Sequence, residues 1–245
     1  MALPFNNKII LITGAASGIG RATSIALSSL GATLALSDIN ETGLSGTNAL
    51  CGGTHLQEVL DVSSSTSCKA HIDHIISTHR TIHHIFNCAG VNPTPSPLIE
   101  TTDAYWDKLM NTNLRGIYNI TRATIPHLSP GASFVNVSSL LGLHPGVNNA
   151  IYCATKYGVI GFSKSMALEL GSKGVRVNVV APGYIDTPTN ASVMAGAEAI
   201  GRTEKEVAMG RMGSPEEVAE VVCFLMGEGA RYVNGAVVEV NGGTG

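Results

Sequence analysis

Long apolar runs, clusters of like charge and paired cysteines are all missing from this chain of 245 residues. No apolar stretch approaches the ~18–20 residues that span a bilayer, and the opening MALPFNN has neither the charged nor the apolar region of a secretory signal. The formal net charge is −3 and Lys and Arg form no runs, which disfavours nucleic acid and anionic membranes as partners. We therefore expect a soluble, cytoplasmic protein that binds a small molecule.

The cysteines and histidines lack the spacings of known metal or disulfide frameworks. Five cysteines are an odd number and include no C-x-x-C pair, so we expect reduced thiols. His71 and His74 are spaced for one helix face, and His79, His83 and His84 follow. Because no Cys or Glu completes a zinc set and H-E-x-x-H is absent, we expect a solvated helix face and no metal.

What the chain does have is apolar residues in alternating patterns. Hydrophobic residues make up 44% of it and charged residues 13%, enough to build a substantial core. Short β-branched runs alternate with helical stretches, which predicts an α/β fold: a single Rossmann-type, doubly wound domain over 1–245, with a parallel sheet of about seven strands and helices on both faces. The strands are expected at 8–12, 33–37, 56–62, 82–87, 133–138, 175–181 and 236–240, and the helices near 18–30, 40–50, 63–79, 102–127, 150–172 and 215–226.

A glycine-rich turn follows the first predicted strand. Its spacing is T-G-x-x-x-G-x-G, formed by Thr13, Gly14, Gly18 and Gly20. Small residues let the backbone approach a ligand closely, and the free N–H groups of a helix N-terminus can hold a pyrophosphate without Lys or Arg. An ordinary turn between strand and helix is the alternative for this pattern taken alone.

Acidic residues end the second and third predicted strands. Asp38 lies about 20 residues past the glycines, where a carboxylate can accept hydrogen bonds from both hydroxyls of an adenosine ribose and repel a 2′-phosphate. Neither neighbour of Asp38 is basic, and Ser17 stands where an NADP-preferring enzyme could carry Arg or Lys, so NAD is favoured. Capping of the next helix is the competing role for Asp38. Polar groups of Asp61 and Val62 are candidates for contact with the adenine edge.

Tyr152 and Lys156 are four residues apart and share one face of a predicted helix. A free tyrosine has a pKa of ~10 and is a poor base at neutral pH. Lowering this pKa by ~3 units requires ~4 kcal/mol, which one ammonium group ~4–5 Å away can supply at an effective dielectric near 20. We therefore expect Tyr152 to act as the general base during hydride transfer, with a lysine packed over a tyrosine ring as the alternative.

Seven motifs occur in the order seen in one enzyme family. The chain resembles the short-chain dehydrogenase/reductase family over nearly its whole length. The motifs are TGAASGIG at 13–20, NCAG at 87–90, Asn113 in NTNLRG, NVSSLLG at 136–142, YCATK at 152–156, APGYIDTP at 181–188 and VNGG at 240–243.

The resemblance implies a catalytic tetrad of Asn113, Ser139, Tyr152 and Lys156. Ser139 would polarise the substrate oxygen, Lys156 would also bind the nicotinamide ribose, and Asn113 would position a water that relays the proton. Backbone after Pro182 and the Thr187 hydroxyl would fix the carboxamide. The residues that we expect to bind the cofactor are Gly14, Ser17, Gly18, Ile19, Gly20, Asp38, Ile39, Asp61, Val62, Asn87, Ala89, Gly90, Tyr152, Lys156, Pro182, Gly183, Ile185 and Thr187.

Two positions depart from the family pattern, and one cysteine lies beside the tetrad. Cys88 stands where Asn is usual and Asn241 where Asp is usual. Cys88 is small and neutral, so we expect a change in packing rather than a lost activity. Successive helix positions point about 100° apart, so we expect the Cys153 thiol to face away from Tyr152.

The segment after Thr187 is expected to form a substrate lid near 187–212. Its apolar residues, with those that follow Ser139, favour an apolar pocket for a hydrophobic secondary alcohol or ketone, although these residues could equally pack the lid helices. His144 or Asn149 is a candidate to orient the substrate. The residues that suggest the apolar pocket are Val193, Met194, Ile200, Met209, Leu140, Leu141, Leu143 and His144.

The sequence thus predicts an NAD(H)-dependent oxidoreductase that interconverts a secondary alcohol and a ketone. The alternatives are a 3-oxoacyl-type ketoreductase and a nucleotide-binding protein without turnover. The long predicted helix from Tyr152 to Leu170 carries only three charged residues, so one of its faces needs a partner subunit; we expect a homodimer or homotetramer.

Overall fold

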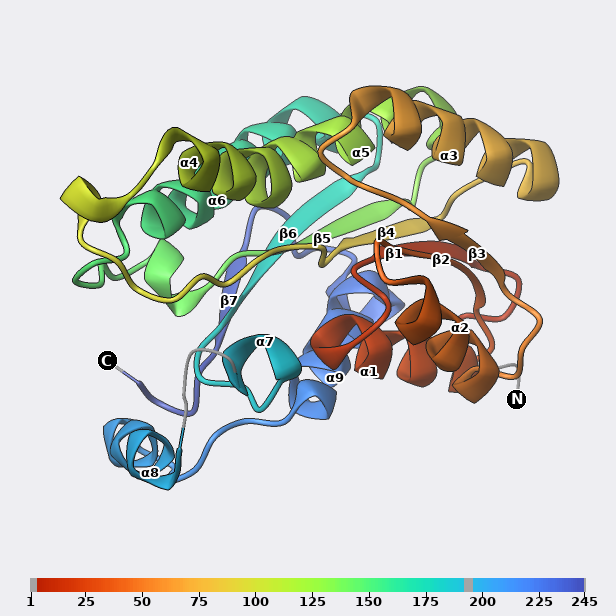
Figure 1. The fold of residues 1–245 in the computed structure, drawn as a ribbon. Helices are drawn as coiled ribbons and strands as arrows, with labels where there is room; N and C mark the ends of the chain where they lie inside the picture. The colour runs from red at the N-terminus through yellow and green to blue at the C-terminus, as the bar shows by residue number, and fades with distance from the viewer. Residues whose placement is uncertain (1–3, 192–195, 245) are drawn as a thin grey trace.

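The computed structural model describes residues 4–191 and 196–244, and within them seven parallel strands form one sheet between two layers of helices (Figure 1). The strand order is β3-β2-β1-β4-β5-β6-β7. The doubly wound α/β fold expected from the sequence is confirmed. The strands are β1 (Ile9–Thr13), β2 (Thr33–Asp38), β3 (Leu56–Val59), β4 (His84–Asn87), β5 (Ser133–Val137), β6 (Arg176–Pro182) and β7 (Val237–Val240).

Helices α1, α2 and α9 lie on one side of the sheet, and α3, α5 and α6 lie on the other (Figure 1). In the described part of the chain, no helix is both long and apolar enough to cross a bilayer. The α-helices are α1 (Gly18–Ser29), α2 (Glu41–Leu50), α3 (Ser65–His79), α4 (Asp103–Leu109), α5 (Gly116–Thr124), α6 (Ala150–Gly171), α7 (Pro188–Ala191), α8 (Ala197–Glu206) and α9 (Pro215–Met226). Short 3₁₀ segments are η1 (Leu98–Glu100), η3 (Ile125–His127), η4 (Leu140–Gly142) and η5 (Glu228–Ala230), and η2 (Met110–Arg115) is π-helical.

Alternate residues of each central strand supply two separate cores. In β1, Ile10 and Ile12 pack in the core that includes Val222 of α9, whereas Leu11 packs in the core that includes Ile72 of α3. All three β1 side chains are fully buried. Covering the sheet on both faces explains why its strands are continuous apolar runs in the sequence.

The chain changes direction across the sheet at β1. This strand pairs with β2 on one side and with β4 on the other, and Thr13 is in register with both Ser37 and Asn87. Helical connections therefore leave β1 and β4 in opposite directions, which opens a crevice at the carboxyl ends of the strands. The motifs singled out in the sequence follow these ends.

Two elements differ most from their predicted bounds: one strand is shorter, and one helix is divided into several segments. The strand expected at 56–62 stops at Val59, because Asp61 accepts the backbone N–H of Ser63 and turns the chain toward α3. The helix expected at 102–127 is divided into α4, the π-helical η2, α5 and η3. Asn113 lies in the π-helical turn, a geometry that is frequent at functional sites.

Candidate active site

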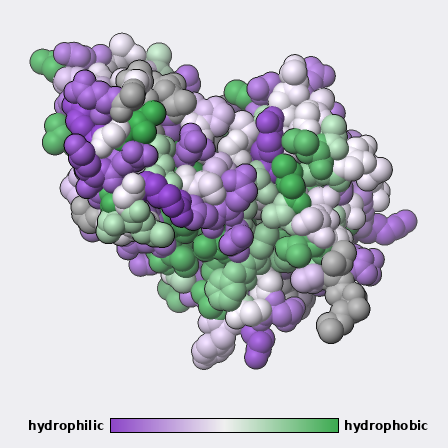
Figure 2. All heavy atoms as spheres, turned by 90° about the horizontal axis from the view of Figure 1, so that it is seen from below, coloured by the Kyte–Doolittle hydropathy of each residue, from purple (hydrophilic) through white to green (hydrophobic). Residues whose placement is uncertain are grey.

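A cavity of about 1020 Å³ lies at the carboxyl ends of the central strands. Seen from below, the surface is hollowed between the side that carries α8 and the side that carries α2 (Figure 2). The predicted site residues that line the cavity are Gly14, Ser17, Gly18, Ile19, Asp38, Ile39, Asp61, Val62, Ala89, Gly90, Ser139, Tyr152, Lys156, Pro182, Gly183, Ile185 and Thr187. We call the part lined by Gly14, Ser17, Gly18, Ile19 and Asp38 the cofactor end, and the part lined by Asn92, Ser139, Leu141, Asn149, Tyr152 and Asn190 the substrate end.

The glycine-rich turn has no room for side chains at two of its positions. Gly14 has φ = +71°, and a Cβ on it would lie 2.7 Å from the backbone nitrogen of Ala89. Gly20 does not line the cavity, but a Cβ there would lie 2.0 Å from the carbonyl oxygen of Gly14. Ser17, the N-cap of α1, makes no side-chain cap, so the first N–H groups of the helix stay available to an anion. The turn therefore fits a pyrophosphate.

Asp38 braces this turn instead of capping the helix that follows it. Its Oδ2 accepts the backbone N–H of Ala16 at 3.0 Å, and its Oδ1 accepts that of Asn40 at 2.9 Å. Asn40 itself is the N-cap of α2, because its side chain accepts the N–H of Gly43. Asp38 is half-buried at the rim of the cavity, where its charge fits a ribose with free hydroxyls better than a 2′-phosphate.

Ser139, Tyr152 and Lys156 meet at the other side of the cavity. Ser139 precedes η4, and its Oγ accepts the N–H of Leu141. Its hydroxyl lies close enough to Tyr152 to act on the pKa of the phenol. Tyr152 and Lys156 lie one turn apart on α6, and the Lys156 Nζ is 5.6 Å from the centre of the Tyr152 ring. Lys156 also donates to the carbonyl of Val137 at 3.1 Å, which anchors it to the end of β5.

Burial dominates the pKa values of this group in the protein without cofactor. It raises the pKa of Tyr152 to about 12, against a smaller lowering by the Ser139 hydroxyl. Burial lowers the pKa of Lys156 to about 8. The sequence argument expected a lowered Tyr152 pKa, and for the protein alone that direction is wrong, because loss of solvent around the phenol outweighs the neighbouring groups.

Asn87 and Asn113 do not line the cavity and instead support its wall. Asn113 is fully buried; its Oδ1 accepts the N–H of Val91 at 2.8 Å and its Nδ2 donates to the Val91 carbonyl at 3.0 Å. A Cβ on Gly90 would lie 3.2 Å from Asn113 Oδ1 and 3.7 Å from Lys156 Nζ. The side chains of Asn113 and Lys156 therefore both lie next to Gly90. Asn87 donates to Asn136 within the sheet.

Two cysteines lie close to the residues of the site, Cys88 after β4 and Cys153 next to Tyr152 on α6. Burial raises the pKa of Cys88, which lines the cavity, to about 12, in keeping with a packing role. Cys153 is buried and is not among the lining residues, as expected from its helix position. All five cysteines are free, which confirms the expected thiols.

The lid is more polar than the sequence suggested. Ile200 and Met209 are 39% and 65% exposed and do not line the cavity, so an apolar pocket built from them is wrong. Leu143 and His144 are also absent from the lining, whereas Leu140 and Leu141 belong to it. Val193 and Met194 lie outside the described residues. Charged side chains line the cavity instead: Asp107, Lys108, Arg202 and Glu206.

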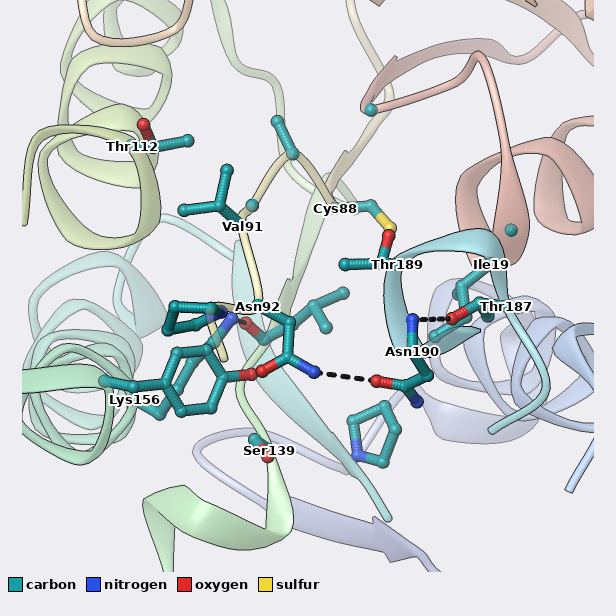
Figure 3. Close-up of a pocket in the computed structure, with 18 of the residues that line it drawn as sticks. Ile19, Cys88, Val91, Asn92, Thr112, Ser139, Lys156, Thr187, Thr189 and Asn190 are labelled. Carbon is teal, nitrogen blue, oxygen red and sulfur yellow. Dashed lines mark hydrogen bonds between the residues drawn. The ribbon is translucent and has the colours of Figure 1, made fainter. Parts of the chain in front are cut away.

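Sequence reasoning missed a pair of asparagines that bridge the substrate end. Asn92, in the loop after β4, donates from Nδ2 to Asn190 Oδ1 on α7 at 2.7 Å (Figure 3). It also missed Arg21, whose guanidinium holds the outside of the glycine turn at the carbonyl of Ala16. No local motif marks Asn92 and Asn190, because they meet across 98 residues of chain.

The histidines lie away from the cavity, and one of them corrects an expectation. Nδ1 of His71 and Nδ1 of His74 each lie 3.0 Å from Glu58 Oε2, next to the edge strand β3. His74 faces solvent, but His71 is fully buried, so a solvated face is wrong for that residue. Within residues 4–191 and 196–244, no group of three or more His, Cys, Asp or Glu side chains is arranged to hold a metal ion.

Comparisons with known proteins agree with the motifs. A family model described as Enoyl-(Acyl carrier protein) reductase matches residues 14–245. The chain is 35% identical over 241 residues to a 3-oxoacyl-[acyl-carrier-protein] reductase of Thermotoga maritima, covering 96% of this chain and 97% of that protein. It is also 35% identical over 247 residues to a cyclohexanol dehydrogenase of an Acinetobacter species, covering 99% and 96%. A crystal structure titled Short-chain dehydrogenase/reductase SDR:Glucose/ribitol dehydrogenase, from Brucella melitensis, matches with a TM-score of 0.94 at 30% identity, covering 100% and 99%.

Proposed function

The chain belongs to the short-chain dehydrogenase/reductase family, and we propose that it is an NAD(H)-dependent oxidoreductase that interconverts a secondary alcohol and a ketone. The observation that carries the proposal is the meeting of Ser139, Tyr152 and Lys156 on one cavity, whose far end is lined by the glycine-rich turn and Asp38. A protein that only bound the nucleotide would have no need of that catalytic group.

Each member of the group has a distinct task. A bound nicotinamide supplies the hydride acceptor or donor. In oxidation the Tyr152 phenolate takes the proton of the substrate alcohol, and in reduction the Tyr152 hydroxyl gives this proton to the ketone oxygen. Ser139 holds that oxygen in place. Lys156 carries a positive charge beside the Tyr152 ring and stabilises the phenolate that oxidation requires. Asn113 fixes the Gly90–Val91 backbone next to Lys156, and we assign the proton relay to this wall of the cavity.

Asp38 supports the choice of NAD over NADP. Its carboxylate lies at the cofactor end and is held by the Ala16 and Asn40 N–H groups, so it cannot turn away from a ribose without losing both bonds. None of the residues that line the cofactor end is basic. The Asp38 carboxylate would therefore repel a 2′-phosphate, and no positive side chain of this end would offset the repulsion.

A 3-oxoacyl-type ketoreductase is the second candidate. Lys108 and Arg202 line the cavity and can meet the phosphate of a phosphopantetheine arm. Similarity to a 3-oxoacyl-[acyl-carrier-protein] reductase supports the same possibility.

The deciding experiment offers cyclohexanone and acetoacetyl-CoA as substrates, each with NADH and with NADPH. Consumption of the reduced nicotinamide is followed by its near-ultraviolet absorbance. We expect NADH with cyclohexanone to give the higher kcat/KM. A preference for acetoacetyl-CoA would select the second candidate, and no turnover with any combination, together with tight dinucleotide binding, would select the non-catalytic one.

We also propose a homodimer or homotetramer built on α6. Phe162 and Gly158 of α6 line a largely apolar groove with Met110, Leu114 and Tyr118 from η2 and α5. Asn111 and Arg115 of η2 also line this groove. Phe162→Glu should reduce the sedimentation coefficient to that of a monomer at micromolar concentration, because an apolar contact tolerates an unpaired charge badly. Lys164→Glu, at an exposed position of the same helix, is the control. A wild type that sediments as a monomer would contradict the proposal.

A further inference from the structure

The loop after β4 and the lid helix α7 are joined by two asparagine side chains that both line the cavity. Asn92 and Asn190 are 98 residues apart in the chain, and the hydrogen bond between them is 2.7 Å long. Both residues are half-buried. Figure 3 shows the two side chains pointing toward one another, with this bond between them.

Asn190 has only one way to orient its amide. Its Nδ2 donates to the carbonyl of Ile185 at 2.8 Å, and its backbone N–H donates to the Thr187 hydroxyl at 3.3 Å. Because a carbonyl can only accept, the nitrogen of the Asn190 amide must point at Ile185 and the oxygen must point at Asn92.

That orientation sets the orientation of Asn92 in turn. An oxygen on Asn190 can bind only the amide nitrogen of Asn92, so the Asn92 oxygen is turned away from the lid. In Figure 3 this oxygen points away from Asn190, toward the side of the cavity from which Lys156 extends. No protein group donates to it among the hydrogen bonds of the described residues. The cavity that Ser139 and Tyr152 line therefore also presents an amide acceptor whose orientation is fixed by Asn190.

We propose that Asn92 Oδ1 binds a second hydroxyl group of the substrate, and that Asn190 is the positioning residue that holds this acceptor in place. The preferred substrate is then a hydroxy ketone, or the corresponding diol, rather than a molecule whose only polar group is the reacting one. This inference rests on the proposed function, because the first hydroxyl or ketone must occupy Ser139 and Tyr152.

Apolar side chains and a further asparagine line the cavity together with Asn92. Leu140, Leu141 and Val91 provide apolar contacts for a carbon skeleton. Asn149 also lines the cavity, and its Nδ2 is bound to the carbonyl of Val147 within its own loop. Asn92 differs because its orientation is set by Asn190 on α7, a segment that is distant in the chain.

The test uses three achiral ketones: cyclohexanone, 4-hydroxycyclohexanone and 4-methoxycyclohexanone. The hydroxyl can donate a hydrogen bond, the methoxy group can only accept one, and cyclohexanone has neither. In the wild type we expect kcat/KM for the hydroxy ketone to exceed that for the methoxy ketone about five- to tenfold, the effect of one neutral hydrogen bond. Racemic 3-hydroxycyclohexanone and its methyl ether repeat the comparison at a second spacing.

Three variants locate the effect. Asn92→Leu removes the acceptor and should bring the hydroxy-to-methoxy ratio close to one. Asn190→Leu should lower the same ratio, because Asn92 is then free to turn, and the cyclohexanone rate serves as the internal reference for any general loss. Asn149→Leu is the matched control and should leave the ratio unchanged.

The outcomes separate the inference from the proposed function. Reduction of all the ketones without preference at either spacing, or a preference that survives Asn92→Leu, would overturn the inference while leaving the oxidoreductase intact. Loss of the preference in Asn149→Leu alone would assign the acceptor to Asn149 and overturn it as well. Absence of any reduction, with either cofactor, would reject the proposed function itself.

Discussion

At the cofactor end of the cavity, Gly14, Gly18 and Asp38 lie where a tight turn and a strand end place them. At the substrate end, Asn92 and Asn190 meet across 98 residues of chain. The first end is held by backbone groups and one carboxylate. The second is held by side chains from a loop and a lid helix. The cofactor end is therefore built on a turn and a strand end that local patterns predict, whereas the proposed selection of substrate rests on a contact between two distant segments.

The largest effect that separates the two ends is expected at Tyr152. Tyr152→Phe removes only the ionisable oxygen, so turnover should fall by ~10²–10⁴-fold while dinucleotide affinity stays nearly unchanged. Steady-state rates and a fluorescence titration with NADH measure the two quantities. Near-normal turnover in Tyr152→Phe would show that another residue is the base.

Companion variants sharpen this result. Lys156→Met should reduce both turnover and cofactor affinity, because Lys156 is expected to act on the phenol and on the nicotinamide ribose. Ser139→Ala should reduce turnover and spare affinity, since its hydroxyl lies on the substrate side.

A methyl group placed in the glycine turn should damage the cofactor end alone. Gly20→Ala puts a Cβ 2.0 Å from the Gly14 oxygen, which should weaken NAD binding at least tenfold and cost about 1–3 kcal/mol of unfolding free energy. Gly161→Ala on α6 meets nothing within 4 Å and should instead stabilise the protein by about 0.4–1 kcal/mol. Dinucleotide titration and urea unfolding measure both variants. Equal behaviour of the two would mean that the turn is not as tight as described.

Asp38 should control the choice of dinucleotide by about tenfold. The wild type is expected to bind NAD(H) at least ten times more tightly than NADP(H), a difference of ~1.4 kcal/mol. Asp38→Ala should narrow this gap, mainly by removing repulsion of the 2′-phosphate. Asp38→Asn removes the charge and retains an acceptor for the Ala16 N–H, so a narrowed gap in both variants assigns the effect to charge. Equal wild-type affinities for the two cofactors would contradict the assignment.

The smallest effect concerns Lys156, which lies between the two ends. Burial lowers its pKa from 10.5 to about 8, so between these values the unfolded chain binds more protons than the folded protein. Stability must then rise with pH in that window, and the contribution from Lys156 should grow by about 1 kcal/mol between pH 7 and pH 9. The measurement is the difference in unfolding free energy between wild type and Lys156→Met, without cofactor, across this range. A difference that does not change with pH would mean that Lys156 is not buried as a cation.

The sequence predicted most of the fold and of the cofactor end because both follow from local rules. Apolar runs such as 8–12 predict strands that are buried on both faces of a sheet. Gly14 directly follows β1, and Asp38 is the last residue of β2, so both lie at the carboxyl edge of the sheet. Strand β3 was overextended because Leu60 and Val62 are apolar and buried although they lie outside the strand. Asn113 was correctly placed near Lys156 by family resemblance, but its bonds to Val91 were not foreseeable from spacing.

By itself the sequence determined the doubly wound sheet, the glycine turn and the one-turn spacing of Tyr152 and Lys156, since each depends on residues close together in the chain. Only the tertiary structure decided that His71 is buried beside Glu58 and that Asn190 reaches Asn92. The same structure exposes the side chains of Ile200 and Met209 to solvent. It also decided the direction of the Tyr152 pKa, because burial of the phenol is produced by segments that no local pattern brings together.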